Sequence, residues 1–147
     1  MNRLFFAALL LNGLLAVAAN AQSAPTSTDV GPVRSSAAYS VVLLRKTEIE
    51  ADLVSFTDDY TEENPRVVDA RFELASLTRD LDRMFGIKPS DVGKLTEATG
   101  KLITRKAELE TERNKLLRAY KDDHPHVKRV TRKLDIYSKA VKQILGQ

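Results

Sequence analysis

Residues 120–127 read Tyr-Lys-Asp-Asp-His-Pro-His-Val, and 60 positions earlier residues 60–67 read Tyr-Thr-Glu-Glu-Asn-Pro-Arg-Val. The match extends outward without a gap. Residues 45–50 (Arg-Lys-Thr-Glu-Ile-Glu) correspond to residues 105–110 (Arg-Lys-Ala-Glu-Leu-Glu), and Leu74 corresponds to Leu134. A match at one fixed offset is the signature of repeated structural units. The sequence therefore predicts two equivalent units in tandem.

Each unit has the pattern of a helix, a tight turn and a second helix. Apolar residues on both sides of the turn recur at steps of three, four or seven, which is typical of one helix face packed on a neighbour. The last helix shows this best, with Val127, Val130, Leu134, Tyr137, Val141 and Ile144. We expect helices over residues 35–60, 65–85, 90–121 and 125–145.

The prolines of the two motifs explain the turns. Proline disfavours helical geometry in the residue before it and is well suited to the first position of a helix. Asn64 and His124 therefore become N-caps, a role for which Asn is a preferred residue. The other members of the turn motif are Pro65, Val67, Pro125 and Val127, together with Tyr60 and Tyr120, which we expect to pack beneath the bend.

A short segment, residues 86–90, joins the two units. Gly86 can end a helix and Ser90 can cap the next one. So short a connection favours antiparallel neighbours. We expect an all-α protein of two tandem antiparallel helical hairpins, coiled-coil-like, at residues 36–85 and 91–147. Two arrangements stay open: the hairpins close as a four-helix bundle, which we favour, or remain open and pair with another chain.

Two glycines fall inside the expected third helix. Gly93 and Gly100 are seven residues apart. This spacing puts both on one helix face, where the missing side chains would let a neighbouring helix approach closely.

The N-terminus has the features of a secretory signal peptide. Arg3 precedes an apolar run over residues 4–18, and Ala19-Asn20-Ala21 fits a small-x-small cleavage site. We expect cleavage after Ala21, a flexible polar leader over residues 22–35, and a periplasmic or secreted mature protein. The run is shorter than the ~20 residues of a membrane span. The chain contains no Cys, so its stability must come from helix packing without disulfides.

Charge is divided unequally between the units. Residues 36–85 hold 6 Lys/Arg and 11 Asp/Glu, a net charge of −5, whereas residues 86–147 hold 15 and 8, a net charge of +7. Our first interpretation is complementarity, within one chain or head-to-tail between two. The alternative is that the basic hairpin binds an acidic polysaccharide or lipid head groups through Lys128, Arg129, Arg132 and Lys133. Nucleic acid is disfavoured because interleaved aromatic residues are lacking.

Candidate catalytic and metal-binding residues are few. The segment Asp122-Asp123-His124-Pro125-His126 contains residue types that bind metals, but Asn64 and Arg66 stand at the matching places of the first unit, and capping explains both. The carboxylate pairs, such as Glu48 with Asp52, have the spacing of solvated helix surfaces. No nucleophile set, metalloprotease motif or phosphate-binding loop is present. We expect no enzyme activity, cofactor or metal site.

The stretch from Leu116 to Val127 resembles a signature of bacterial exopolysaccharide chain-length determinants, the polysaccharide co-polymerases. Their periplasmic coiled-coil segment often reads Tyr, a few polar residues, His-Pro-x-Val and a basic amphipathic helix. Tyr120, His124, Pro125, Val127, Lys128 and Leu134 match that pattern. The first unit matches it less fully, since Asn64 replaces the histidine. The two membrane spans of that family, and the kinase domain that some members carry, have no counterpart in this sequence.

We therefore expect an exported, non-catalytic interaction or structural module. Its partners would be other proteins or further copies of the chain, bound along the helix seams. The resemblance implies an accessory role in envelope or exopolysaccharide assembly. Two alternatives are binding of an anionic polysaccharide or lipid head groups by the second hairpin, and a periplasmic holdase chaperone.

Overall fold

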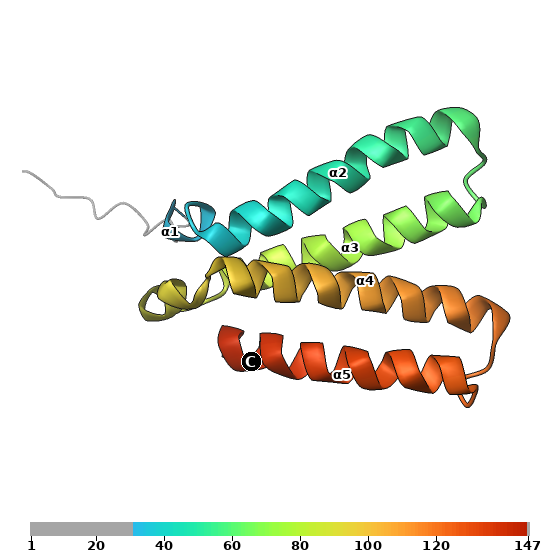
Figure 1. The fold of residues 1–147 in the computed structure, drawn as a ribbon. Helices are drawn as coiled ribbons and strands as arrows, with labels where there is room; N and C mark the ends of the chain where they lie inside the picture. The colour runs from blue at the N-terminus through green and yellow to red at the C-terminus, as the bar shows by residue number, and fades with distance from the viewer. Residues whose placement is uncertain (1–30, 147) are drawn as a thin grey trace, which may run out of the picture.

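The computed structural model describes residues 31–146, and all regular structure within that range is helical (Figure 1). The expectation of an all-α protein is confirmed. The signal peptide, its cleavage site and most of the leader fall on residues 1–30, outside the described residues. The elements in chain order are α1 (Gly31–Arg34), α2 (Ala37–Asp59), α3 (Pro65–Phe85), the 3₁₀-helix η1 (Pro89–Lys94), α4 (Glu97–Ala119) and α5 (Pro125–Leu145).

The repeat extends to the helix boundaries. The helices α4 and α5 begin and end 60 positions after the corresponding ends of α2 and α3. The caps recur too, since Ser36 and Thr96 cap α2 and α4 with their side chains, and Tyr60 and Tyr120 end these helices. Equivalent residues in the two units therefore occupy equivalent places along the helices.

The segment between the units differs from expectation. We predicted a helix from residue 90 with Ser90 as its cap, but Pro89–Lys94 form η1 and α4 begins at Glu97. The hydroxyl of Thr96 accepts a hydrogen bond from the Thr99 amide and thus caps α4. The last part of the expected leader also differs, because Gly31–Arg34 form α1 and Val33 is buried. Gly86 ends α3 as predicted.

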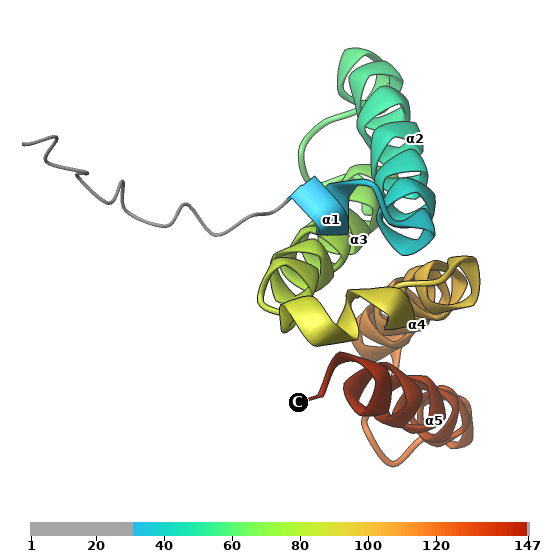
Figure 2. The ribbon, with the colours of Figure 1, turned by 90° about the vertical axis from the view of Figure 1, so that its left-hand side faces the viewer.

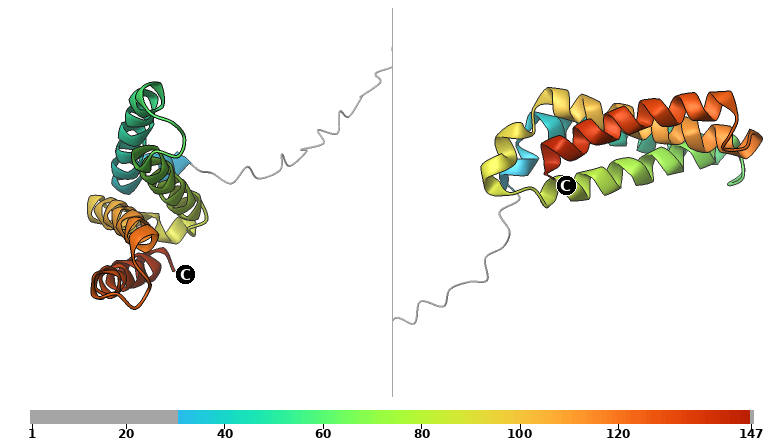
Figure 3. Two further views of the ribbon diagram at one scale, coloured as in Figure 1. Left: turned by 90° about the vertical axis from the view of Figure 1, so that its right-hand side faces the viewer. Right: turned by 90° about the horizontal axis from the view of Figure 1, so that it is seen from below.

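The helix α4 lies at the centre of the packing. The end views in Figures 2 and 3 place it between α5 and the pair formed by α2 and α3. It packs along all three of these helices, whereas α5 packs along α4 and meets η1 only at its C-terminal end. Within residues 31–146, α5 therefore does not pack along α2 or α3, as it would in a regular closed four-helix bundle.

The apolar core gathers at the end of the molecule that carries α1 and η1 (Figure 1). Fully buried members include Val42, Leu77, Met84 and Ile103, and Val141 and Leu145 of α5 join them. The two turns lie at the opposite end of the molecule. The helices are thus held together most tightly where the chain passes from the first unit to the second.

Gly100 allows α4 to approach α2 closely. A Cβ atom at this position would lie 2.8 Å from Val41 Cβ and 2.9 Å from the carbonyl oxygen of Ala38. The prediction of a close helix approach is confirmed here. It is wrong for Gly93, which lies in η1 and has nothing within 4 Å of a Cβ position.

Candidate interaction surfaces

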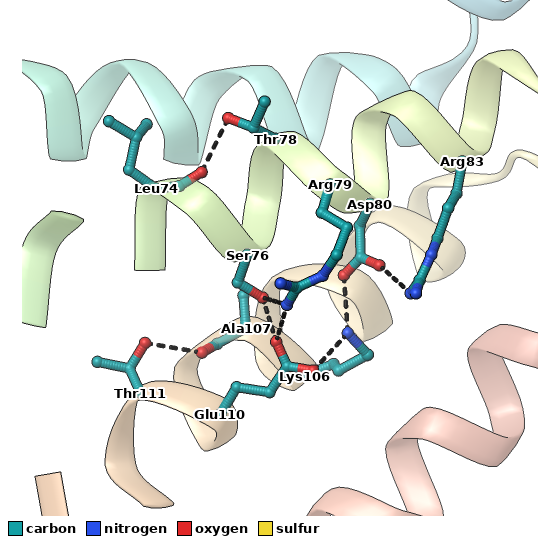
Figure 4. A network of polar contacts seen from close by, with 10 residues as sticks. All are labelled: Leu74, Ser76, Thr78, Arg79, Asp80, Arg83, Lys106, Ala107, Glu110 and Thr111. Carbon is teal, nitrogen blue, oxygen red and sulfur yellow. Dashed lines mark hydrogen bonds and ion pairs between the residues drawn. The ribbon is translucent and has the colours of Figure 1, made fainter. Parts of the chain in front are cut away.

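The junction between α3 and α4 contains a polar network (Figure 4). Lys106 Nζ is 3.0 Å from Asp80 Oδ2 and 2.7 Å from Glu110 Oε1. Glu110 also accepts hydrogen bonds from Ser76 and, at 2.9 Å, from Arg79. Asp80 is fully buried and is paired with Arg83 as well. Every charged group of the network is paired with a group of opposite charge inside the chain. We therefore interpret the network as a structural contact that holds α3 and α4 together.

The environment of Glu110 has two opposing effects on its pKa. Burial acts to raise the pKa of this carboxyl, whereas hydrogen bonds from Lys106 and Ser76 and the charges of Lys106 and Arg79 lower it. The net pKa of Glu110 is lowered. The ionised form of this carboxyl is therefore part of the junction between the two units.

Opposite charges also meet elsewhere along the junction. Arg118 of α4 pairs with Asp69 of α3, close to the turns. Within the first unit, Arg45 donates to Glu73 at 2.8 Å, which raises the pKa of the arginine. The complementarity inferred from the divided charge thus operates in part within one chain.

The turn residues mainly terminate and begin helices. Asn64 Oδ1 accepts from the Arg66 amide at 2.9 Å, and His124 Nδ1 accepts from the His126 amide at 3.3 Å. Both N-caps are confirmed, and each proline begins its helix. Val67 and Val127 are buried, as the stripes require.

The two turn tyrosines are not buried beneath the bend. Tyr60 is 38% exposed and Tyr120 45%. Tyr120 stacks on the His124 ring, with a centroid distance of 4.1 Å, and His124 stacks on His126 at 5.3 Å. Across residues 31–146, no three or more His, Cys, Asp and Glu side chains form a group that could hold a metal ion.

The basic residues singled out on α5 form one exposed surface. Lys128, Arg129, Arg132 and Lys133 are all exposed, and so are Lys139 and Lys142 further along the helix. None of the ion pairs found among residues 31–146 includes any of these six residues. We call them the α5 basic surface. Its charge is not compensated by the ion pairs of the described chain, unlike that of Arg118 or Lys106.

The hollows of the described surface are open grooves. One of about 360 Å³ lies between α3, α4 and α5, where Phe72, Leu117 and Leu134 line it together with Arg79 and Glu110. Another, of about 320 Å³, adjoins the α5 basic surface at Arg113, Thr131 and Arg132. Both grooves are open to solvent, and several charged side chains line each of them.

Exposed apolar residues form a feature that our sequence analysis missed. Leu43, Leu44 and Val54 of α2 are 39%, 63% and 65% exposed, and Ile136 of α5 is 68% exposed. The repeat offset contained the signal, because Leu43 corresponds to Ile103, which is fully buried. An equivalent residue that is buried in one unit and exposed in the other marks a face that lacks its neighbour.

No protein-family model, curated protein sequence or solved structure matches this chain. None of the helices described for residues 31–146 combines the length and apolar character needed to cross a membrane.

Proposed function

We propose that the protein is an exported, non-catalytic helical module that binds other macromolecules through the outer faces of α2 and α5. One observation carries this proposal: large apolar side chains are exposed on the two outer helices, namely Leu43, Leu44 and Val54 on α2 and Ile136 on α5. Contiguous exposed apolar surface marks interaction sites, and the spacing of Leu43 and Val54 places them on one face of α2. Export, and an accessory role in envelope or exopolysaccharide assembly, enter the proposal from the sequence alone.

The architecture belonging to this proposal is a pair of tandem helical hairpins. The equal helix bounds at an offset of 60 and the packing of α4 on both α2 and α3 support it. In such tandem arrays each unit packs mainly on its neighbours.

Photo-cross-linking in intact cells tests the proposal. A photoreactive residue at position 43 or 136 is expected to give cross-linked products of higher mass. The same residue at Asp52, which is exposed on α2 but lies apart from Leu43 and Val54, is the matched control. Absence of products from both apolar positions, in a chain that is exported and folded, would overturn the proposal.

A second candidate function is the binding of an anionic polysaccharide or lipid head groups. The α5 basic surface favours it, because six exposed cations lie on one helix without an ion-pair partner among the described residues. Attraction of this kind is screened by salt. We expect salt-dependent retention on an acidic polysaccharide column that is lost when Lys128, Arg129, Arg132 and Lys133 are changed to Gln. The control variant loses the same amount of charge elsewhere, with Gln in place of Lys88, Lys94, Lys101 and Lys115. If the column retains this variant as strongly as the wild type, the position of the cations matters as well as their number.

A further inference from the structure

The two units have the same helices but different surroundings. The surface formed by α2 and α3 is covered by α4 of the second unit. The corresponding surface formed by α4 and α5 carries no further helix among residues 31–146 (Figure 2). Likewise, none of the helices described for residues 31–146 packs along the face of α2 that corresponds to the packed face of α4. The described chain thus has two complementary faces without a neighbour.

The open face of α2 is more polar than its buried counterpart but keeps a large apolar residue at the position of Ile103. The packed face of α4 contains Gly100, Ile103, Lys106, Ala107 and Glu110, and the residues 60 positions earlier are Ser40, Leu43, Lys46, Thr47 and Glu50. Leu43 is 39% exposed, whereas Ile103 is fully buried. Val54 extends the same face, since residues 43, 47, 50 and 54 follow steps of four, three and four.

The open face of α5 carries one large apolar residue and two cations. Ser76 of α3 contacts Glu110 of α4 inside the chain, and its counterpart on α5 is Ile136, which is 68% exposed and lies opposite Glu50 in the same register. Counterparts of Asp69 and Arg79, which form ion pairs across the junction, are Arg129 and Lys139. Both are exposed and belong to the α5 basic surface.

The charges of the two open faces are complementary in the register of the internal junction. The internal pair of Arg118 with Asp69 becomes Asp58 with Arg129, with the signs exchanged. The internal pair of Glu110 with Arg79, 2.9 Å apart, becomes Glu50 with Lys139.

The third internal pair introduces no repulsion in that register. Lys106 with Asp80 becomes Lys46 with Ala140, so that no like charges meet. Lys46 is already paired with Glu50 within α2, just as Lys106 is paired with Glu110 within α4.

We propose that a second copy of this chain is the occupant: its α2 face docks on α4 and α5 in the register of the contact that α4 makes with α2 and α3. The docked helix lies further from α4 than α4 does from α2, because Ser40 stands where Gly100 allows the close approach. The inference rests on the proposed interaction function and names its partner. Because the two faces differ, the contact is heterologous, and successive copies add head to tail into an open chain or a ring. The charge pairs of this contact lie near the surface, where salt screens their attraction. The association should therefore weaken at high salt.

Light scattering coupled to size exclusion of the mature chain tests the proposal. The wild type is expected to form oligomers that grow with concentration and dissociate at high salt. Two variants should each be monomeric: Glu50→Lys with Asp58→Lys, and Arg129→Glu with Lys139→Glu. A mixture of the two should assemble again, because each altered face then meets a partner of opposite charge.

Matched controls separate a specific register from general charge effects. The control variant Asp52→Lys with Asp59→Lys makes the same charge change on α2. The counterparts of these two residues on α4 are Glu112 and Ala119, and neither takes part in the ion pairs or hydrogen bonds that join the units. This variant should assemble like the wild type, and circular dichroism should show all variants equally helical. A wild type that is monomeric at every concentration, or a mixture that stays monomeric, would overturn the head-to-tail contact. Cross-links from position 136 to a different macromolecule would then still support the interaction function.

Discussion

Gly100 is a residue at which the two units come into close contact. An alanine there would place its Cβ 2.9 Å from the backbone oxygen of Ala38, and a backbone atom cannot move aside like a side-chain end. We expect Gly100→Ala to destabilise the protein by about 1–3 kcal/mol, as overpacked sites do, although alanine is the better helix former. Urea denaturation followed by circular dichroism measures the change.

Gly93→Ala is the control for this substitution, because nothing lies within 4 Å of its Cβ position. It should be neutral or slightly stabilising, since it reduces the conformational freedom of the unfolded chain. If Gly100→Ala were as stable as the wild type, α4 could not be as close to α2 as the structure places it.

Lys106 is a buried cation whose contribution depends on its partners. Its side chain is 6% exposed and lies 3.0 Å from the fully buried Asp80. Replacing the lysine alone leaves carboxylates in the junction with fewer partners, so we expect Lys106→Met to cost about 3 kcal/mol. Replacing both partners, as in Lys106→Met with Asp80→Leu, should cost clearly less. A double variant no more stable than Lys106→Met alone would show that the pair is not coupled.

At the scale of the helical element, the two turns differ in one residue of interest. Asn64 caps α3 with a 2.9 Å hydrogen bond, whereas His124 caps α5 with one of 3.3 Å. Asn ranks among the best N-caps and His does not. Asn64→Ala should therefore cost about 1 kcal/mol, and His124→Asn should raise the denaturation midpoint. His126→Asn, which leaves the capping side chain in place, should change the midpoint little.

The helix boundaries show which signals the sequence carries. Pro65, Pro125 and Gly86 act through local geometry, so the ends that they set were predicted correctly. The start of α4 was wrong because Pro89 followed by Ser90 fits a helix start equally well, while the backbone there forms η1. Tertiary packing decided that choice, since the Ala38 amide donates to the Leu95 oxygen at 3.1 Å, just before the Thr96 cap.

The exposed residues of α2 and α5 were singled out only in part. Four cations of α5 were proposed to bind anions, and the structure places all four at the surface, while the binding itself stays a prediction. Leu43 and Ile136 were missed, since an apolar residue on a helical stripe looks the same whether or not its neighbour is present. Lys106 was missed for a related reason, because only the fold brings it against Asp80.

At the scale of the whole molecule, the junction between the units depends on the ionised form of Glu110. Its pKa is lowered in the folded chain, so ionisation stabilises the fold above the pKa of the unfolded chain. That stabilisation is lost as the pH falls through the folded pKa. Glu110→Gln should therefore be about 1–3 kcal/mol less stable than the wild type at pH 7.

The difference between wild type and Glu110→Gln should then shrink as the pH falls below about 4, where carboxyl groups bind protons. Urea midpoints from neutral to acidic pH measure this convergence. Glu97→Gln is the control, because Glu97 has a lowered pKa through its hydrogen bond with Lys101 but is exposed at the start of α4. An exposed ion pair contributes little, so this variant should follow the wild type across the range. If Glu110→Gln ran parallel to the wild type at every pH, its cost would come from packing, and the charge of Glu110 would have no part in holding the two units together.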